Sequence, residues 1–190
     1  MKNESQLIDE SLGGNTAAFG ELVRTHQDRL FNAVTHFIGD ATEAEDVVQE
    51  AFVQAYLKLS SFHRTSAFYT WLYRIAFNTA VSRKRRKRVV TSVDTNREQT
   101  SEEPIDRGDA PDKPMLREEQ AVLVQAALRT LSDEHSAILV LREVDGLEYE
   151  EIGQVLEINV GTVRSRLHRA RIALREKLIE MRVVSDGELN

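Results

Sequence analysis

The sequence lacks cysteine altogether, and it contains only three prolines and nine glycines. The absence of cysteine excludes disulfides, thiolate metal sites and a cysteine nucleophile. Scarce proline and glycine favour helices over strand-and-turn architectures, and a hydrophobic fraction of 41% is sufficient for packed cores. No apolar run approaches the length of a membrane span, and the polar start MKNESQLIDE differs from a signal peptide. We therefore expect an all-α, cytoplasmic protein with no membrane span.

Patterns typical of a catalytic centre are also missing. The five histidines are scattered along the chain, no HExxH spacing occurs, and there is no glycine-rich phosphate loop. We therefore predict that the protein is not an enzyme, and that it holds no metal and no cofactor.

Charge is distributed in blocks of opposite sign. The net charge is −6, yet residues 63–90 carry eight basic and no acidic side chains, and residues 161–182 carry seven basic and two acidic ones. The segments 1–62, 91–120 and 121–160 are each net acidic. Local field rather than total charge decides whether phosphates are attracted. The pattern favours two separate contacts with DNA.

Residues 147–177 show two helical patterns around a short turn at residues 157–161. The apolar stripe of the second pattern is Val163, Leu167, Ala170 and Leu174. The polar and cationic side chains that lie off this stripe are Arg164, Ser165, His168, Arg169, Arg171 and Arg175. Thr162 is expected as an N-cap or first-turn residue. Such a bracing helix followed by a small basic helix is typical of a helix-turn-helix that enters the DNA major groove; an ordinary helical hairpin with a solvated cationic face is the alternative.

Apolar spacing predicts helices over most of the rest of the chain as well. The expected ranges are 5–14, 16–39, 43–59, 67–88, 116–131 and 134–144. Residues 91–115 are polar and acidic, contain all three prolines and show no helical or strand period, which predicts a flexible linker. The fold class is therefore all-α, with two small helical domains, a linker and a C-terminal helix-turn-helix.

Two surfaces of the N-terminal half each allow more than one interpretation from the sequence alone. The helix at 43–59 carries an exposed face of Asp46, Gln49, Glu50 and Val53, which by periodicity alone is most simply solvated. The helix at 67–88 has more aromatic residues than one stripe requires, and it ends in the basic run 83–88. Rings beside cations suit single-stranded nucleic acid, because bases stack on the rings while phosphates meet the cations. A core-facing aromatic cluster with a solvated basic end is equally consistent.

Three stretches together resemble the bacterial extracytoplasmic-function (ECF) sigma factors, close to the sigma-E type. They are AEDVVQEAF at 44–52, AFYTWLYRIAFN at 67–78, and YEEI at 149–152 followed by GTVRSRLHRAR at 161–171. The resemblance covers roughly residues 10–180. It implies a domain at 1–90 that binds core RNA polymerase and melts the −10 element, a linker at 91–115, and a −35-reading domain at 116–182.

The resemblance also implies residue roles. Asp46, Gln49, Glu50 and Val53 become contacts with core polymerase. The candidates for −10 DNA are Ser66, Phe68, Tyr69, Arg74, Asn78, Arg83, Arg85 and Arg86, whereas Trp71 is expected in the core. The candidates for −35 DNA are Arg142, Tyr149, Thr162, Arg164, Ser165, Arg166, His168 and Arg169. His168 departs from the aromatic residue expected at its position.

The implied partners are core RNA polymerase, promoter DNA and an anti-sigma factor, with the chain monomeric when free. A stand-alone helix-turn-helix regulator with an N-terminal sensing domain is the alternative function. The face at 46–53 together with the aromatic-basic helix argues against it, because a sensing domain needs neither feature.

Overall fold

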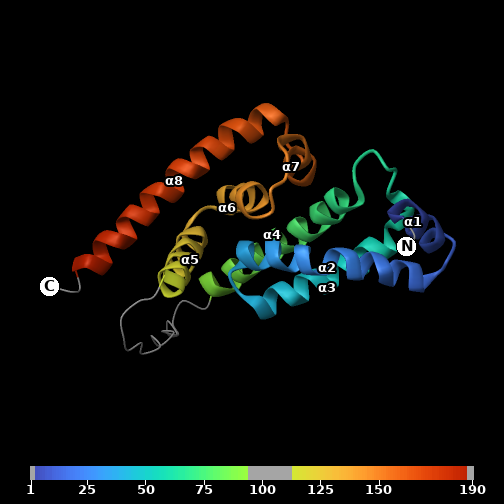
Figure 1. Cartoon of the computed structure of the whole chain (residues 1–190), viewed down its shortest axis with the longest axis horizontal. Helices are drawn as coiled ribbons and strands as arrows, with labels where there is room; N and C mark the ends of the chain where they lie inside the picture. Colours follow the sequence, from blue (N-terminus) through green and yellow to red (C-terminus); the bar gives the residue numbers. More distant parts are fainter. Residues whose placement is uncertain (1–2, 94–112, 188–190) are drawn as a thin grey trace.

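The computed structural model describes the main chain of residues 3–93 and 113–187 and the side chains of residues 3–88 and 120–181. Within these ranges the regular structure is helical and contains no strand (Figure 1). The N-terminal unit consists of α1 (Glu4–Leu12), α2 (Thr16–Ile38), α3 (Ala41–Leu57), the short η1 (Leu59–Ser61) and α4 (Phe68–Val93). The C-terminal unit consists of α5 (Lys113–Thr130), α6 (Asp133–Leu139), the π-helical turn η2 (Val140–Val144), α7 (Tyr149–Leu156) and α8 (Val160–Gly187). The expected all-α fold is confirmed.

Short polar side chains begin the N-terminal helices. Asn3, Asn15 and Asp40 each accept hydrogen bonds from backbone N–H groups of the first turn that follows them, which satisfies donors that have no partner within the helix. Gly39 ends α2 in the left-handed conformation, with φ of 82°. A side chain there would be strained, and a Cβ would also come within 2.8 Å of Arg129 Cδ on α5.

Aromatic rings fill the interior of the N-terminal unit. Phe62, Phe68 and Trp71 form one cluster, with ring centroids 5.3 to 5.8 Å apart. Phe37 on α2 lies against Phe77 on α4, at 5.3 Å. All five side chains are buried. The aromatic surplus of residues 67–88 is thus mainly a packing feature, and the expectation that Trp71 belongs to the core is confirmed.

The C-terminal unit begins its helices with the same chemistry. Ser132 caps α6, and Glu148 and Glu151 form a capping box at the start of α7. Asn159 accepts the backbone N–H of Thr162 at 2.8 Å, so Asn159 caps α8 and Thr162 lies in its first turn. Between α7 and α8, Glu157 has φ of 56°, the left-handed conformation that closes the turn. The helix-turn-helix pattern is present at the predicted place.

Helix ends differ from the expected ones at both sides of the linker. α4 continues to Val93 rather than ending at 88, and α5 begins at Lys113 rather than 116. The central part of the expected linker, residues 94–112, lies outside the described residues. α8 runs on to Gly187, well past the stripe that ends at Leu174.

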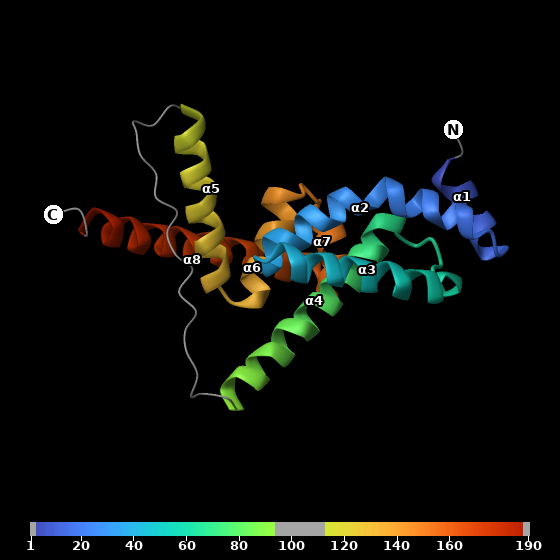
Figure 2. The same ribbon diagram turned by 90° about the horizontal axis from the view of Figure 1, so that it is seen from below.

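The two units pack against each other (Figure 1, Figure 2). α7 lies against α4, and α2 meets both α5 and η2. The buried apolar residues form one continuous cluster through both units. α1 and the C-terminal end of α8 lie at opposite ends of the molecule, and α8 extends away from the contact between the units. No helix among the described residues combines the length and apolarity that crossing a membrane requires.

Candidate nucleic-acid and polymerase interfaces

The cationic face of α8 is open to solvent. Arg164, Ser165, His168 and Arg169 are exposed, while Leu167 between them is 1% exposed. Arg169 donates from Nε to the carbonyl of Ser165 at 3.2 Å. Within the described part of the chain, neither Arg164 nor Arg169 forms an ion pair with a carboxylate. These guanidinium groups are available to phosphates or base edges.

Other −35 candidates are engaged within the unit. The Thr162 hydroxyl donates to Asn159 Oδ1 at 3.0 Å, and the Ser165 hydroxyl donates to the carbonyl of Thr162 at 3.1 Å. Arg166 is only 21% exposed in its side chain and pairs with Glu134 at 3.2 Å. Thr162 and Arg166 therefore hold the start of α8 in place, in addition to any contact with DNA.

Arg142 and Tyr149 form a small stacked pair at the base of the helix-turn-helix. The Arg142 guanidinium lies 5.1 Å from the centre of the Tyr149 ring and donates to the carbonyl of Leu147 at 2.7 Å. It also pairs with Glu148 at 3.3 Å. Both residues are half-buried, so a phosphate would meet only their outer edges.

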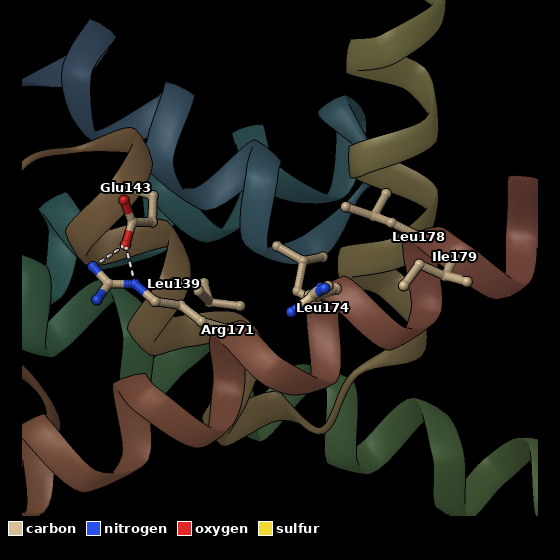
Figure 3. A pocket seen from close by; sticks show the side chains of 7 residues that line it. Leu139, Glu143, Arg171, Leu174, Leu178 and Ile179 are labelled. Atoms are coloured by element: carbon tan, nitrogen blue, oxygen red, sulfur yellow. Dashed lines mark hydrogen bonds and ion pairs between the residues drawn. The ribbon is translucent and has the colours of Figure 1, made fainter.

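Further along α8 the surface becomes apolar. A hollow of about 500 Å³ lies between α6, η2 and the C-terminal half of α8 (Figure 3). Its lining residues are Leu139, Glu143, Arg171, Leu174, Arg175, Leu178 and Ile179. At one side Arg171 donates to Glu143 through Nε and Nη2, at 2.9 and 2.6 Å. Sequence reasoning missed Leu178 and Ile179, because the stripe was followed only to Leu174.

The outer face of α4 lines a polar hollow of about 470 Å³. Among its lining residues are the candidates Arg74, Asn78, Arg83 and Arg86. Glu157, which belongs to the C-terminal unit, closes part of the rim, and its carboxylate lies 3.8 Å from Arg74 Nη1. The structure therefore brings several −10 candidates together around one hollow. The carboxylate of Glu157, from the C-terminal unit, lies at the same hollow.

Phe68 is a correction to the predicted site. Its side chain is 1% exposed and packs among Phe62, Trp71 and His26. Its ring cannot stack on a base unless this cluster is unpacked. The aromatic pattern could not separate Phe68 from Tyr69, because neighbouring positions on a helix point only about 100° apart.

Tyr69 and Ser66 remain at the surface of the predicted site. Both are half-buried. The Tyr69 hydroxyl donates to the carboxylate of Glu151 on α7, and the Arg29 guanidinium lies 5.2 Å from the centre of the Tyr69 ring. The Tyr69 ring is thus covered from the C-terminal unit as well as from α2.

The basic run at the end of α4 is paired with acids at several positions. Arg83 contacts Glu50 at 2.9 Å and Asp46 at 3.3 Å. Lys84 and Arg88 both contact Asp133, at 3.0 and 2.9 Å. Arg85 and Arg86 are exposed. The Arg83 contacts join a residue expected at −10 DNA to two residues expected at the polymerase.

The predicted polymerase face on α3 is exposed. Asp46, Gln49 and Val53 are exposed and Glu50 is half-buried. Val53 is 59% exposed and Leu57, one turn further on, is 72% exposed. Sequence reasoning missed Leu57; the available signal was its i+4 spacing from Val53 along the polar face.

Sequence reasoning also missed an ion pair between the units, in which the Asp145 side chain is 5% exposed and that of Arg29 is 47% exposed. Arg29 on α2 donates from Nε to Asp145 Oδ1 at 2.9 Å, and from Nη2 to the Asp145 carbonyl at 3.0 Å. Tyr73 on α4 donates to the same Oδ1 at 3.2 Å. Burial, together with the charge of Asp145, raises the pKa of Tyr73, so the phenol stays neutral as a donor. Arg29 and Asp145 are 116 positions apart, and no local pattern relates them.

The described residues contain no cluster of three or more histidines and carboxylates that could hold a metal ion. The chemistry of the site is that of charge, hydrogen bonding and stacking.

Comparison with known proteins assigns both units. Residues 22–89 match sigma-70 region 2, and residues 121–174 match sigma-70 region 4. The chain is 40% identical to the RNA polymerase sigma-H factor of Pseudomonas aeruginosa, over 94% of this chain and 95% of that protein. It is 38% identical to the ECF RNA polymerase sigma-E factor of Escherichia coli, over 90% of this chain and 92% of that protein.

Solved structures agree with this assignment. The structure of CnrH in complex with the cytosolic domain of CnrY matches with a TM-score of 0.67 and 29% identity, over 92% of this chain and 96% of that one. The sigma factor RpoE of Bartonella quintana, in complex with the anti-sigma factor NepR, matches with a TM-score of 0.62 and 26% identity, over 84% and 96%. Together with the family matches, these likenesses show that the chain belongs to the ECF sigma factors.

Proposed function

We propose that this protein joins core RNA polymerase and directs it to promoters by contacting the −10 and −35 elements. The observation that carries the proposal is the presence, in one chain, of an open cationic helix-turn-helix and a separate cationic helix, α4. Two cationic surfaces on two units suit two promoter elements that lie apart on the DNA.

The −35 contact is assigned to the first half of α8. Arg164, Ser165, His168 and Arg169 project from the helix into solvent, whereas the opposite stripe is buried. Arginine recognises guanine through two hydrogen bonds in the major groove, and serine contacts bases or phosphates. Arg142 and Tyr149 contact backbone phosphates at the edge of this surface.

The −10 contact is assigned to the outer face of α4 and the loop before it. Ser66, Tyr69, Arg74 and Asn78 hold unstacked bases, with Arg83, Arg85 and Arg86 on phosphates. Stacking of bases on an aromatic ring, together with cations on the phosphates, stabilises a melted strand. Phe68 supports this surface from inside the core.

The contact with core polymerase is assigned to Asp46, Gln49, Glu50 and Val53 on α3, extended to Leu57. Two carboxylates, an amide and two exposed apolar side chains on one helix suit a partner surface that is basic around an apolar centre. Glu50 and Asp46 reach this partner only if they exchange Arg83 for the partner's cations.

An anti-sigma factor is proposed as a further partner, and the free chain is proposed to be a monomer. Support comes from the RpoE structure, in which the sigma factor is bound by an anti-sigma factor.

Run-off transcription tests the proposal. Purified core polymerase is mixed with this protein and a promoter library, and the transcripts are sequenced. We expect start sites that share two motifs and that appear only when both proteins are present. A protein that binds duplex DNA tightly by itself and has no effect on core polymerase is instead a stand-alone regulator, and that outcome would contradict the proposal.

A further inference from the structure

The loop between η1 and α4 is closed at its base by two aromatic rings. Phe62 and Phe68 stand at its two ends, are 9% and 1% exposed, and have ring centroids 5.7 Å apart. The five residues between them, 63–67, have no regular structure, and their side chains are exposed or half-buried. The closed base fixes where the loop leaves the core, but it leaves the path of the residues in between undetermined.

The middle of this loop has a backbone conformation that most side chains disfavour. Arg64 has φ of 57°, in the left-handed region. That region is costly for a residue with a side chain, because Cβ comes too close to the following carbonyl oxygen. Such a conformation persists only where the surrounding structure imposes it. The contacts of the Arg64 side chain therefore matter for the path of the loop.

Those contacts come from α1. The Arg64 guanidinium donates from Nη1 to Ser5 Oγ at 3.0 Å and from Nη2 to Asp9 Oδ1. Ser5 and Asp9 are four residues apart, so they lie on the same face of the helix, and one guanidinium group bridges them. α1 is itself held on the core by Leu7 and Ile8, which are 8% and 3% exposed. The middle of the loop is thus fastened to a helix that is packed on the core.

α1 also contacts both ends of the loop. It packs against η1, directly before the loop. At the other end, His26 Nε2 on α2 lies 2.7 Å from Glu4 Oε1, and the His26 ring lies 5.5 Å from the ring of Phe68. α1 therefore contacts the beginning and the middle of the loop directly, and its end through His26.

We propose that α1 positions residues 63–67, which we name the −10 loop, for contact with an unstacked base of the −10 element. Arg64 is the positioning residue, held by Ser5 and Asp9. The inference rests on the proposed function, which places Ser66 of this loop at −10 DNA. Ser66 follows Arg64 by two positions, so the backbone path at Arg64 determines where Ser66 lies. A loop that is ordered beforehand loses less freedom on binding and adapts less to a wrong base.

The sign of one effect separates this role from a simple electrostatic one. Asp9→Ala removes an acid and releases the Arg64 guanidinium. If Arg64 acted only as a cation toward phosphates, this change would strengthen the contact with DNA. If Arg64 positions the −10 loop, the same change weakens discrimination among −10 sequences.

Two further changes complete the design. Glu10→Ala is the matched control, because it removes the same charge at the next position of α1, where the carboxylate accepts from Asn15 rather than from the loop. The exchange of Asp9→Arg with Arg64→Asp restores opposite charges across the same contact and keeps the net charge of the chain. Aspartate also tolerates the left-handed conformation better than most residues. A direct contact of Arg64 with DNA is lost in the exchange, whereas the link to α1 is restored.

Run-off transcription with core polymerase measures the effects on full-length chains. The template is a promoter found with the unmodified chain, randomised at either its −10 or its −35 positions, and discrimination is the yield from the preferred base relative to the others. We expect Asp9→Ala to lower −10 discrimination by about two- to fivefold, the range open to an exposed ion pair, and Arg64→Asp to lower it at least as much. The exchange should recover most of the loss, and Glu10→Ala should match the unmodified chain. Discrimination at −35 should stay the same throughout, which also shows that each chain is folded.

Three outcomes overturn the inference. If Asp9→Ala keeps or increases −10 discrimination, α1 does not position the −10 loop. If the exchange fails to recover what Arg64→Asp loses, Arg64 acts on DNA directly. If −10 and −35 discrimination fall together, Asp9 supports the whole protein rather than the loop. Failure of the proposed function is seen separately, because the unmodified chain with core polymerase then yields no −10 motif.

Discussion

The cations of α8 and those of α4 meet different surroundings in the same molecule. On α8, Arg164 and Arg169 face solvent, and within the described residues no carboxylate pairs with either. On α4, Arg74, Arg83 and Arg88 each pair with a carboxylate, two of the three with one from the other unit. Similar densities of positive charge thus correspond to one surface whose two outward arginines, Arg164 and Arg169, are open, and to another on which three arginines already have an acidic partner.

The difference shows why charge alone does not define a binding surface. A cation that already has an anionic partner must exchange it, so the gain on binding phosphate is the difference between two pairings. A solvated cation instead exchanges water and counterions, which is the usual source of affinity for DNA. We therefore expect the α8 surface to respond strongly to charge reversal, and the α4 surface to respond first to removal of its acidic partners.

The largest expected effect is on α8. Arg164→Glu combined with Arg169→Glu should weaken recognition of the −35 element by about 1–3 kcal/mol for each lost contact. The measurement is transcription from a promoter that depends on its −35 element. Arg175→Glu, three turns beyond Arg164 on the same helix, is the control for each single reversal, because it makes the same change of charge as Arg164→Glu or Arg169→Glu alone. Normal initiation by the double variant would remove α8 from the −35 assignment.

A glycine-to-alanine substitution tests how tightly the turn between α7 and α8 is packed. A Cβ on Gly153 in α7 would lie 2.8 Å from the carbonyl oxygen of Ile158, in the turn that leads to α8. Gly153→Ala should therefore destabilise the C-terminal unit by about 1–3 kcal/mol, as overpacking does. Gly20→Ala in α2 is the matched change, since the nearest side-chain atom is 3.8 Å away.

That control should be neutral or stabilising, because alanine favours a helix. Urea unfolding followed by circular dichroism measures both variants. Equal stability of the two would show that the tight turn of the helix-turn-helix tolerates a side chain.

Helices and the helix-turn-helix were predictable from the sequence because their signals are local. The capping of α3 by Asp40 involves the N–H of Glu43, three residues away. The apolar stripe of α8 is likewise visible from the four-residue spacing of Val163 and Leu167. The ends of α4 and α5 were placed several residues short, since polar residues next to a linker show no apolar period. Predicted helix positions therefore agree with the structure where a cap or a stripe is present.

The packing of one unit on the other was not predictable in this way. Arg29 and Asp145 look like ordinary surface residues within their own helical patterns, yet they form an ion pair in which the Asp145 carboxylate is buried. Phe68 and Tyr69 likewise differ only in which side of α4 faces the core. The charge blocks did contain the information that a basic and an acidic segment attract each other, but DNA was an equally good partner for the basic block.

A smaller effect is expected on the α3 face. Val53→Glu puts a charge into the centre of the proposed polymerase contact, and it should weaken binding to core polymerase by about 1 kcal/mol, the lower end of the cost of burying an unpaired polar group. Val122→Glu on α5 is the matched control, because the exposed fractions of the two valines are 59% and 62%. Competition binding with labelled core polymerase measures both. Equal affinity of the two variants would return the α3 face to the solvated interpretation.

The smallest effect concerns the link between the polymerase face and the DNA face through Arg83. Its side chain is 32% exposed and that of Glu50 is 43% exposed, so in the free chain their coupling should be only about 0.2–1 kcal/mol. A double-mutant cycle with Arg83→Ala and Glu50→Ala, followed by urea unfolding, measures it.

The same cycle on DNA affinity shows whether the pair matters for function. When Glu50 holds Arg83 back from phosphate, Glu50→Ala raises affinity for single-stranded DNA slightly, and the gain disappears in the Arg83→Ala background. Gln49→Ala is the control, since its amide contacts Glu45 rather than Arg83. A gain that persists without Arg83 would mean that Glu50 acts through general repulsion of the strand. In that case the contrast between α4 and α8 would depend on the field around each helix rather than on individual pairs.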